Sequence, residues 1–189
     1  MRRSGARCRS SIPRCPPLSP GPALIASRRR APARLRERRA GYRARLPGPL
    51  YCDTSALLKL YLPEPGSDQF NAVVEGRDDF LVSDLAVTEI VSAVARRLRQ
   101  GLLTREAARR LQHVILGRLD EGVYQRVELT RDVHRRAEHF LLTLQETPLR
   151  AADALHLALA TSARAASLAS FDVRLAAAAR RVSLAVYPT

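Results

Sequence analysis

The sequence is poor in lysine and in aromatic residues. Lys59 is the only lysine among 32 basic residues, aromatic residues make up 5% of the chain, and tryptophan is absent. So strong a preference for arginine over lysine is typical of GC-rich coding DNA. The density of arginine therefore does not by itself indicate a nucleic-acid-binding protein, although a net charge of +14 would otherwise favour one.

Cysteines and long apolar runs are also scarce. The three cysteines, Cys8, Cys15 and Cys52, are odd in number and show no CxxC spacing, which excludes a disulfide framework and a cysteine zinc site. No apolar run approaches the length of about 18 residues that a membrane span needs, and the N-terminal apolar stretch is too short for a signal peptide. We therefore expect a soluble cytoplasmic protein that does not bind membranes.

Positive charge is concentrated at the N-terminus. Residues 1–50 hold 14 basic residues and one acidic residue, whereas residues 51–189 hold 18 and 17. Residues 1–48 are rich in proline and lack sustained apolar periodicity, so we expect a disordered leader. One interpretation of this leader is an arm that contacts RNA phosphates. The other is an inert extension or a start codon assigned too far upstream, which the scarcity of aromatic side chains for base stacking favours.

Residues 49–189 have the pattern of one folded domain, because short apolar segments alternate with amphipathic ones. Strands are predicted at 50–52, 80–82, 123–129, 167–170 and 182–186, and helices at 56–62, 66–76, 84–100, 104–119, 132–144, 149–165 and 173–181. This alternation is typical of an α/β fold in which helices cover both faces of a parallel sheet.

Acidic residues follow three of the predicted strands. Asp53, Asp84 and Asp172 each come directly or shortly after a strand ends. Ligand sites in open parallel sheets lie at the carboxyl ends of the strands, where the strand order reverses. We therefore expect carboxylates to gather at this edge of the sheet.

Two further acids, Glu89 and Asp153, lie within otherwise apolar helical segments. A carboxylate that faces a core is costly to desolvate unless a positive charge joins it, and few basic residues are close in sequence. Mg²⁺ or Mn²⁺ is the economical partner, because such ions prefer oxygen ligands and no cysteine or histidine cluster indicates zinc. Each acid alone could be a helix cap or a surface residue. Together they predict a metal site.

The same residues belong to motifs that resemble those of a known family. In chain order they are YCDTSALLKLY at residues 51–61, Glu89 early in the long helix, RAADALHLA at residues 150–158 and ASFDVRL at residues 169–175. This ordered set is similar to the motifs of PIN-domain ribonucleases, and most closely to the VapC toxins of bacterial toxin–antitoxin pairs. The resemblance runs from about Leu50 to Pro188 and implies a three-layer α/β/α domain with a central, mostly parallel sheet.

The resemblance also implies a function. Four acids match the acidic positions of the family and are expected to hold one or two Mg²⁺ or Mn²⁺ ions: Asp53, Glu89, Asp153 and Asp172. The hydroxyls of Ser55 and Ser170 are expected to support this cluster. The implied reaction is metal-dependent hydrolysis of RNA phosphodiesters, which leaves a 5′-phosphate and a 3′-hydroxyl. A non-catalytic RNA-binding or partner-binding module remains the alternative.

A homodimer held by a small VapB-like antitoxin is the partnership that the resemblance implies. The contacts are expected near the helices at 84–100 and 104–119, where the apolar stripes exceed what one sheet can cover. The alternative is a monomer in which these helices pack only on each other.

The remaining candidates have weaker patterns. Arg150, one turn before Asp153, contacts either an RNA phosphate or a neighbouring acid. His156 lies three residues after Asp153 on a neighbouring part of the same helical face; we expect it at the edge of the core, with contact to the site as the alternative. Thr54 is expected only to start a helix. A phosphoacceptor signalling domain is excluded, because it needs a lysine after a late strand and Lys59 is the only lysine.

Overall fold

The computed structural model of the chain describes residues 46–188. The predicted leader, residues 1–48, therefore falls almost wholly outside the described residues. The described part contains five strands: β1 (Leu50–Cys52), β2 (Phe80–Ser83), β3 (Gln125–Val127), β4 (Ser167–Ala169) and β5 (Ala185–Tyr187). It also contains seven helices: α1 (Thr54–Tyr61), α2 (Ser67–Val74), α3 (Asp84–Arg99), α4 (Arg105–Asp120), α5 (Arg131–Thr143), α6 (Ala151–Ser162) and α7 (Val173–Arg181).

The strands form one sheet in the order β3-β2-β1-β4-β5, and every neighbouring pair is parallel. The central strand β1 has β2 on one side and β4 on the other, with Cys52 opposite both Val82 and Ala169. The strand order therefore reverses at β1. This reversal places the loops after β1 and β4 side by side at the carboxyl edge of the sheet.

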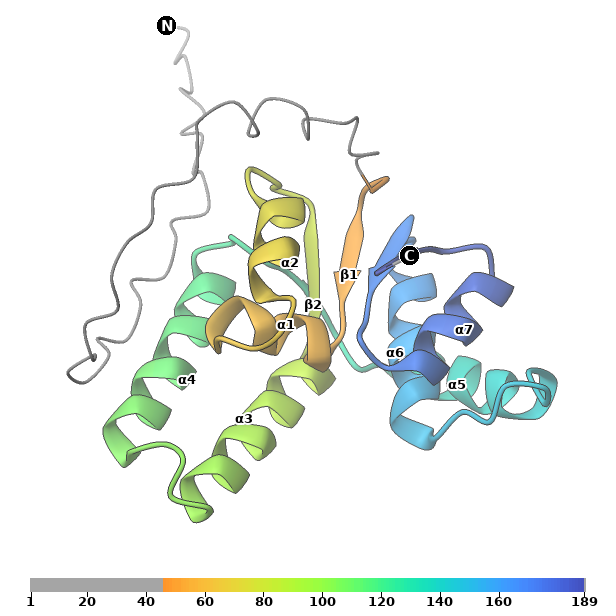
Figure 1. Cartoon of the computed structure of the whole chain (residues 1–189). Coiled ribbons are helices and arrows are strands. Elements are labelled where there is room, and N and C mark those ends of the chain that lie inside the picture. Colours follow the sequence, from red (N-terminus) through yellow and green to blue (C-terminus); the bar gives the residue numbers. More distant parts are fainter. Residues whose placement is uncertain (1–45, 189) are drawn as a thin grey trace, which may run out of the picture.

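Helices cover both faces of the sheet (Figure 1): α1 to α4 lie on one side and α5 to α7 on the other. Successive residues of β1 point to opposite faces, as the period of a strand requires. Leu50 and Cys52 are buried against the first group of helices, and Tyr51 is buried against the second. The predicted three-layer α/β/α architecture is confirmed, and the sheet is wholly parallel.

Polar residues at the ends of strands start the helices that follow. The Asp53 carboxylate accepts the backbone N–H of Ala56 at the start of α1, and the Ser83 hydroxyl accepts that of Ala86 at the start of α3. Asp172 caps α7 in the same way. Such caps satisfy N–H groups that have no partner within the helix. They also bring the first turns of three helices to the carboxyl edge.

Several predicted elements differ from the structure at their ends; the strand predicted at 123–129, for example, is only Gln125–Val127. The last strand begins at Ala185 rather than 182, because Val182 ends α7 and Ser183 adopts a left-handed conformation with φ of 64°. Helix α6 begins at Ala151 rather than 149, because Arg150 is extended and forms its N-cap. Within residues 46–188, no helix is long and apolar enough to cross a membrane.

The first described residues are tied to the opposite, amino-terminal edge of the sheet. The Arg77 guanidinium donates a 2.7 Å hydrogen bond to the carbonyl of Leu46, and the Ser167 hydroxyl donates to that of Pro47. Arg77 is buried and also pairs with Asp79 at 2.9 Å. The folded domain therefore uses backbone groups that precede the first strand.

Candidate active site

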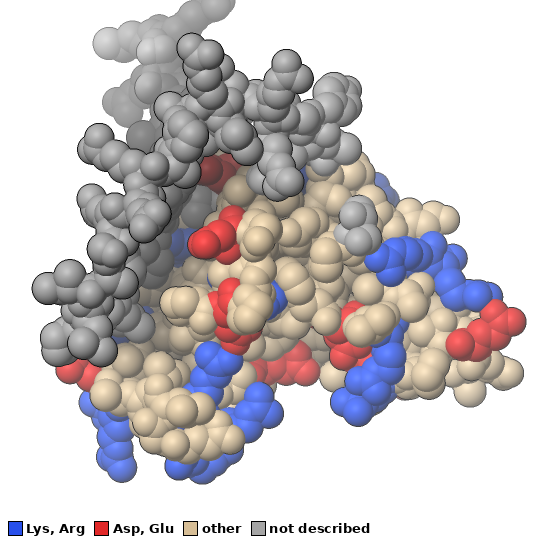
Figure 2. Space-filling model, viewed as in Figure 1, with Lys and Arg blue, Asp and Glu red and all other residues tan. Residues whose placement is uncertain are grey.

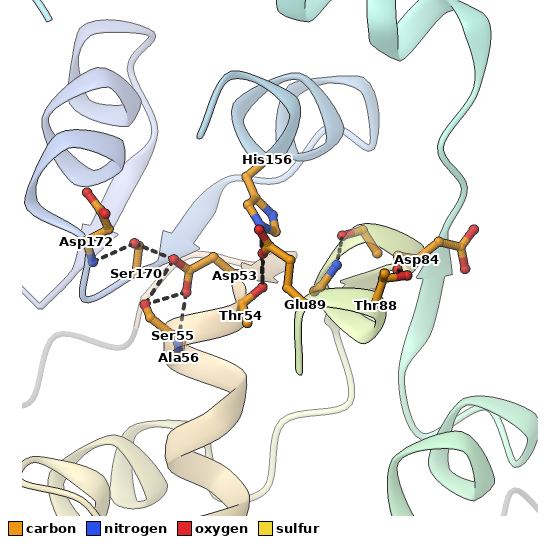
Figure 3. A network of polar contacts seen from close by, with 12 residues as sticks. Asp53, Thr54, Ser55, Ala56, Asp84, Thr88, Glu89, His156, Ser170 and Asp172 are labelled. Atoms are coloured by element: carbon orange, nitrogen blue, oxygen red, sulfur yellow. Dashed lines mark hydrogen bonds and ion pairs between the residues drawn. The ribbon is translucent and has the colours of Figure 1, made fainter. Parts of the chain in front are cut away.

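Asp53 lies at the point where the strand order reverses (Figure 3). Its backbone N–H extends the pairing of β1 with β4 by donating to the carbonyl of Ala169 at 3.1 Å. The side chain is only 4% exposed. Its carboxylate accepts hydrogen bonds from the Ser55 hydroxyl at 2.8 Å, the Ala56 N–H at 2.8 Å and the Ser170 hydroxyl at 2.6 Å. All three donors are neutral, and burial raises the pKa of Asp53 above its usual value.

Ser55 and Ser170 join the loops after β1 and β4. The Ser55 oxygen accepts the backbone N–H of Phe171 at 2.8 Å, and the Ser170 oxygen accepts that of Asp172 at 3.0 Å. Both hydroxyls also donate to Asp53. The structure thus places the two predicted supporting hydroxyls beside Asp53, and their role in catalysis stays a prediction.

Glu89 extends toward the same edge from the second turn of α3 (Figure 3). Its side chain is 33% exposed and accepts hydrogen bonds from the Thr54 hydroxyl and from His156 Nε2, the latter at 2.8 Å. The hydrogen bond from His156 holds the pKa of Glu89 below its usual value. Glu89 is therefore a carboxylate held by two side chains from other elements, α1 and α6.

His156 contacts Glu89, which was the alternative to a place at the core edge, and Thr54, expected only to start α1, contacts Glu89 as well. His156 is buried, and its Nδ1 lies 2.8 Å from the hydroxyl of Tyr51. A signal for this position was present in the sequence. His156 follows Asp153 by almost one helical turn, so the two share a face of α6. Which residue that face meets depends on the strand order.

Asp153 and Asp172 flank a cation, the Arg174 guanidinium. Asp153 accepts the backbone N–H of Arg150 at 2.9 Å, and Asp172 accepts that of Arg174 at 2.8 Å. The Arg174 side chain then lies 3.4 Å from the Asp172 carboxylate and 3.9 Å from that of Asp153. Burial opposes ionisation of Asp172, but the hydrogen bonds from Arg174 and Leu175 prevail and lower its pKa.

Arg174 corrects the expectation that too few basic residues lie near the acids. It sits in the first turn of α7, two residues after Asp172, and its long side chain reaches back to the edge of the sheet. The sequence shows that Arg174 is close to Asp172 along the chain, but spacing alone does not predict the direction of the Arg174 side chain.

Two other predicted residues lie at the margin of the site. The Arg150 side chain is exposed, so its contact with RNA stays a prediction. Asp84 points away from Asp53 (Figure 3) and pairs with Arg126 of β3 at 2.7 Å. Of the three acids expected after strands, Asp53 and Asp172 are joined through Ser170, whereas Asp84 belongs to a separate ion pair.

The donor atoms at this edge suit a hard divalent cation. Carboxylate and hydroxyl oxygens predominate, and the buried Asp53 has only neutral hydrogen-bond donors to offset its charge. Within residues 46–188, however, no three Asp, Glu, His or Cys side chains lie close enough to form a ready metal site. Asp153 and Asp172 both lie against Arg174. A cation would therefore have to compete with that guanidinium.

Several solved structures share this fold. A toxin from Mycobacterium tuberculosis, VapC20, described as cleaving the sarcin-ricin loop, is 18% identical with a TM-score of 0.55; the alignment covers 69% of this chain and 95% of that one. FitAcB from Neisseria gonorrhoeae is 19% identical with a TM-score of 0.54, and the alignment covers 74% of this chain and 96% of that one. VapBC2 from Rickettsia felis, bound to a DNA fragment from its promoter, is 11% identical with a TM-score of 0.53. The alignment covers 72% of this chain and 96% of that one.

No curated protein sequence matches the chain significantly. The three structural likenesses show the fold alone, since each sequence identity is below 25%. A match to the PIN domain family, by contrast, covers residues 50–181, which is well over half of the chain and includes every acid of the site. The chain therefore belongs to the PIN domain family.

Proposed function

We propose that the protein is a divalent-metal-dependent endoribonuclease of the cytoplasm, and the toxin of a VapBC-type toxin–antitoxin pair. The observation that carries this proposal is the buried Asp53 carboxylate, which lies at the reversal of strand order with Ser170 and Asp172 from the neighbouring loop. Membership of the PIN domain family supports nuclease chemistry. The toxins and toxin–antitoxin complexes among the similar structures support the toxin assignment.

Asp53, Glu89, Asp153 and Asp172 would hold Mg²⁺ or Mn²⁺. When bound, such an ion lowers the pKa of a water molecule, orients it toward the phosphodiester and neutralises charge on the leaving oxygen. The chain's own residues prepare the carboxylates. The Ser170 and Ser55 hydroxyls and the Ala56 N–H counter the effect of burial on the pKa of Asp53. Thr54 and His156 fix the orientation of Glu89.

The surface around this edge suits a polyanion. Figure 2 shows basic side chains at the lower ends of α3 and α4 and again beside α7, with acidic side chains between the two groups. The last turn of α3 contributes Arg96, Arg97 and Arg99. Cationic flanks attract the phosphates of RNA, while the acids remain free to take the metal. Arg150, exposed at the start of α6, would contact a phosphate from the other side.

Cleavage of total bacterial RNA by the purified full chain tests the nuclease function. We expect cleavage with Mg²⁺ or Mn²⁺ and none with EDTA, and the products should carry 5′-phosphates. Asp53→Asn should abolish cleavage. Asp84→Asn is the matched control, because Asp84 is a carboxylate at the same edge that pairs with Arg126 outside the site. Normal cleavage by Asp53→Asn would contradict the site, and RNA binding without cleavage would support the non-catalytic alternative.

The antitoxin has a candidate docking groove on the α1–α4 side of the sheet. A groove of about 1140 Å³ lies between the α1–α2 loop and α4, and its apolar lining includes Leu62, Pro63, Leu103, Leu111 and Val114. We propose an apolar segment of the antitoxin as its occupant, because such segments commonly bind grooves between helices. The likeness to FitAcB and VapBC2 supports this choice.

The proposed homodimer would use the outer face of α3 and α4. A shallow apolar groove of about 290 Å³ lies there, and Val91 at its rim is 37% exposed. Light scattering should show a dimer for the full chain and a monomer for Val91→Glu. Leu142→Glu, at a more exposed position on α5, is the control that should remain dimeric.

Growth tests the toxin assignment. Induction of the chain alone should arrest growth, and co-expression of the neighbouring upstream reading frame should restore it. A monomer that neither inhibits growth nor binds that neighbour's product would overturn the toxin assignment and leave the nuclease function standing.

A further inference from the structure

Four buried or half-buried side chains form a continuous chain of hydrogen bonds behind the site. The Ser83 hydroxyl lies 2.8 Å from the Tyr51 hydroxyl, which lies 2.8 Å from His156 Nδ1. His156 Nε2 lies 2.8 Å from the Glu89 carboxylate, at the accessible end (Figure 3). Ser83, Tyr51 and His156 are all buried. We call this set the Ser83–Glu89 relay.

Counting hydrogens gives the relay a direction. The Glu89 carboxylate can only accept, so His156 Nε2 carries the hydrogen between them. The other ring nitrogen, Nδ1, of a neutral imidazole is then an acceptor, which the Tyr51 hydroxyl satisfies by donating to it. The Ser83 hydroxyl donates in turn to the Tyr51 oxygen, while its own oxygen accepts the backbone N–H of Ala86 at 3.1 Å. Every hydrogen in this arrangement has an acceptor.

The relay connects elements that carry or directly precede three of the four acids of the site. Tyr51 is two residues before Asp53 on β1, His156 is three residues after Asp153 on α6, and Ser83 begins the helix that bears Glu89. The chain of hydrogen bonds therefore starts at Ser83, the N-cap of α3, passes through β1 and α6, and ends at Glu89 on α3. A change in its middle is expected to alter where the Glu89 carboxylate sits relative to the other acids.

We propose that His156 is a positioning residue, held in its Nε2–H tautomer by Tyr51 and Ser83 so that it fixes the Glu89 carboxylate. The consequence for catalysis rests on the proposed function, whereas the tautomer does not. Hydrogen-bond partners that orient a metal-binding carboxylate typically change metal affinity or activity by about 10- to 100-fold when they are removed.

Packing alone is the competing explanation of the same geometry. The rings of Tyr51 and His156 are in edge contact with centroids 5.9 Å apart, so both side chains also fill the core. Tyr51→Phe separates the two explanations, because it keeps the ring and removes only the hydroxyl. Tyr124→Phe is the matched control, since Tyr124 is equally buried and its hydroxyl bonds Tyr61 at 2.7 Å, away from the site.

The tautomer can be read directly by nuclear magnetic resonance of the full chain with ¹⁵N-labelled histidine. His156→Gln assigns the signals by their loss. We expect Nε2 of His156 to be protonated and Nδ1 unprotonated. Tyr51→Phe should shift the Nδ1 signal, because that nitrogen loses its hydrogen-bond donor, whereas Tyr124→Phe should leave the signal unchanged. A ring protonated at Nδ1 in the wild type, or unchanged signals in Tyr51→Phe, would overturn the proposal.

Kinetics and metal binding test the consequence. Tyr51→Phe should lower kcat and Mn²⁺ affinity by about tenfold with little change in KM for RNA, and His156→Leu by about 100-fold. His156→Gln, whose amide can still donate to Glu89, should recover most of the loss. Tyr51→Phe should have no further effect in a Glu89→Gln background, because the relay would then have no carboxylate to orient.

The possible failures are distinguishable. If the wild-type chain cleaves no RNA, the proposed function fails, and the tautomer still decides whether the relay exists. If the wild type cleaves RNA but Tyr51→Phe behaves like Tyr124→Phe in every measurement, the relay is overturned and the nuclease function stands.

Discussion

The Ser170 hydroxyl donates a 2.6 Å hydrogen bond to the Asp53 carboxylate, although 117 residues separate the two in sequence. The contact exists because β4 pairs directly with β1, so both residues follow strands that end at the same level of the sheet. Burial raises the pKa of Asp53, and this hydrogen bond opposes the rise. Ser170 therefore helps to keep a buried carboxylate ionised.

Ser170→Ala is expected to destabilise the metal-free protein in a pH-dependent way. Loss of the hydrogen bond raises the pKa of Asp53 further, so the ionised carboxylate costs more in the folded state. Urea unfolding in EDTA should show a loss of about 1.5–3 kcal/mol at neutral pH. The difference should shrink as the pH falls through the folded pKa of Asp53, because a protonated carboxyl needs less support.

Ser162→Ala, at an exposed position on α6, is the control for that measurement. Its effect should be small at every pH. A Ser170→Ala effect that stays constant from neutral to acidic pH would indicate a packing loss and contradict the electrostatic role.

Asp53→Asn should leave the metal-free protein equally stable or slightly more stable, because it removes a buried charge whose donors are all neutral. Mg²⁺ should raise the melting temperature of the wild type by mass action and that of the variant by less. Thermal melting with and without Mg²⁺ measures both effects. Equal stabilisation of the two proteins by Mg²⁺ would place the ion away from Asp53.

Arg174→Gln should strengthen metal binding. The guanidinium lies between Asp153 and Asp172, so it competes with any cation that these carboxylates take. Without metal, loss of a half-exposed ion pair should cost about 0.2–1 kcal/mol. With Mg²⁺, the variant should reach half of its maximal stabilisation at a lower concentration than the wild type.

Arg181→Gln tests whether that result is specific. Arg181 lies on the same helix, α7, and pairs with Glu146 on the exposed surface at 2.6 Å. Its loss should not change the Mg²⁺ concentration required. If both variants bind Mg²⁺ like the wild type, Arg174 does not guard the site.

Deletion of residues 1–44 should leave the stability of the domain unchanged, because the predicted leader lies outside the family match. A chain that begins at residue 49 should have a free energy of unfolding lower by about 1–3 kcal/mol. In that chain the buried Arg77 loses its hydrogen bond to the carbonyl of Leu46, and Ser167 loses its hydrogen bond to the carbonyl of Pro47. Urea unfolding of both deletions tests this difference. Loss of cooperative unfolding in the longer chain would show that the leader is required for folding.

Much of this architecture was predictable, because apolar period and capping residues act locally. The strand at residues 50–52 and the cap at Asp53 follow from a buried run that ends in an acid. Contacts between elements were less predictable. Arg174, Thr54 and His156 reach the acids only because of how three helices are rotated against the sheet. Periodicity shows which face of a helix is apolar. It does not predict which polar side chains of different elements come into contact.

Asp84 illustrates the same limit from the other side. It follows β2 as Asp53 follows β1, so the sequence pattern treats the two alike. The Ser83 hydroxyl caps α3 in its place, and the Asp84 side chain turns to Arg126 on the neighbouring strand β3. The residue after β1, Asp53, caps its helix, whereas the last residue of β2, Ser83, caps α3. This difference of one residue leaves Asp84 outside the site.

Lys59 is the only lysine of the chain, and it is 9% exposed. Its ammonium donates to the carbonyl of Pro65 at 2.7 Å and lies 4.4 Å from the centre of the Phe171 ring. The folded domain consequently presents almost no side-chain amine to solvent. Enzymes that acylate lysine, or that attach a degradation signal to it, can reach Lys59 only when the α1–α2 loop opens. The rate at which an amine-reactive label modifies Lys59 should therefore measure that opening.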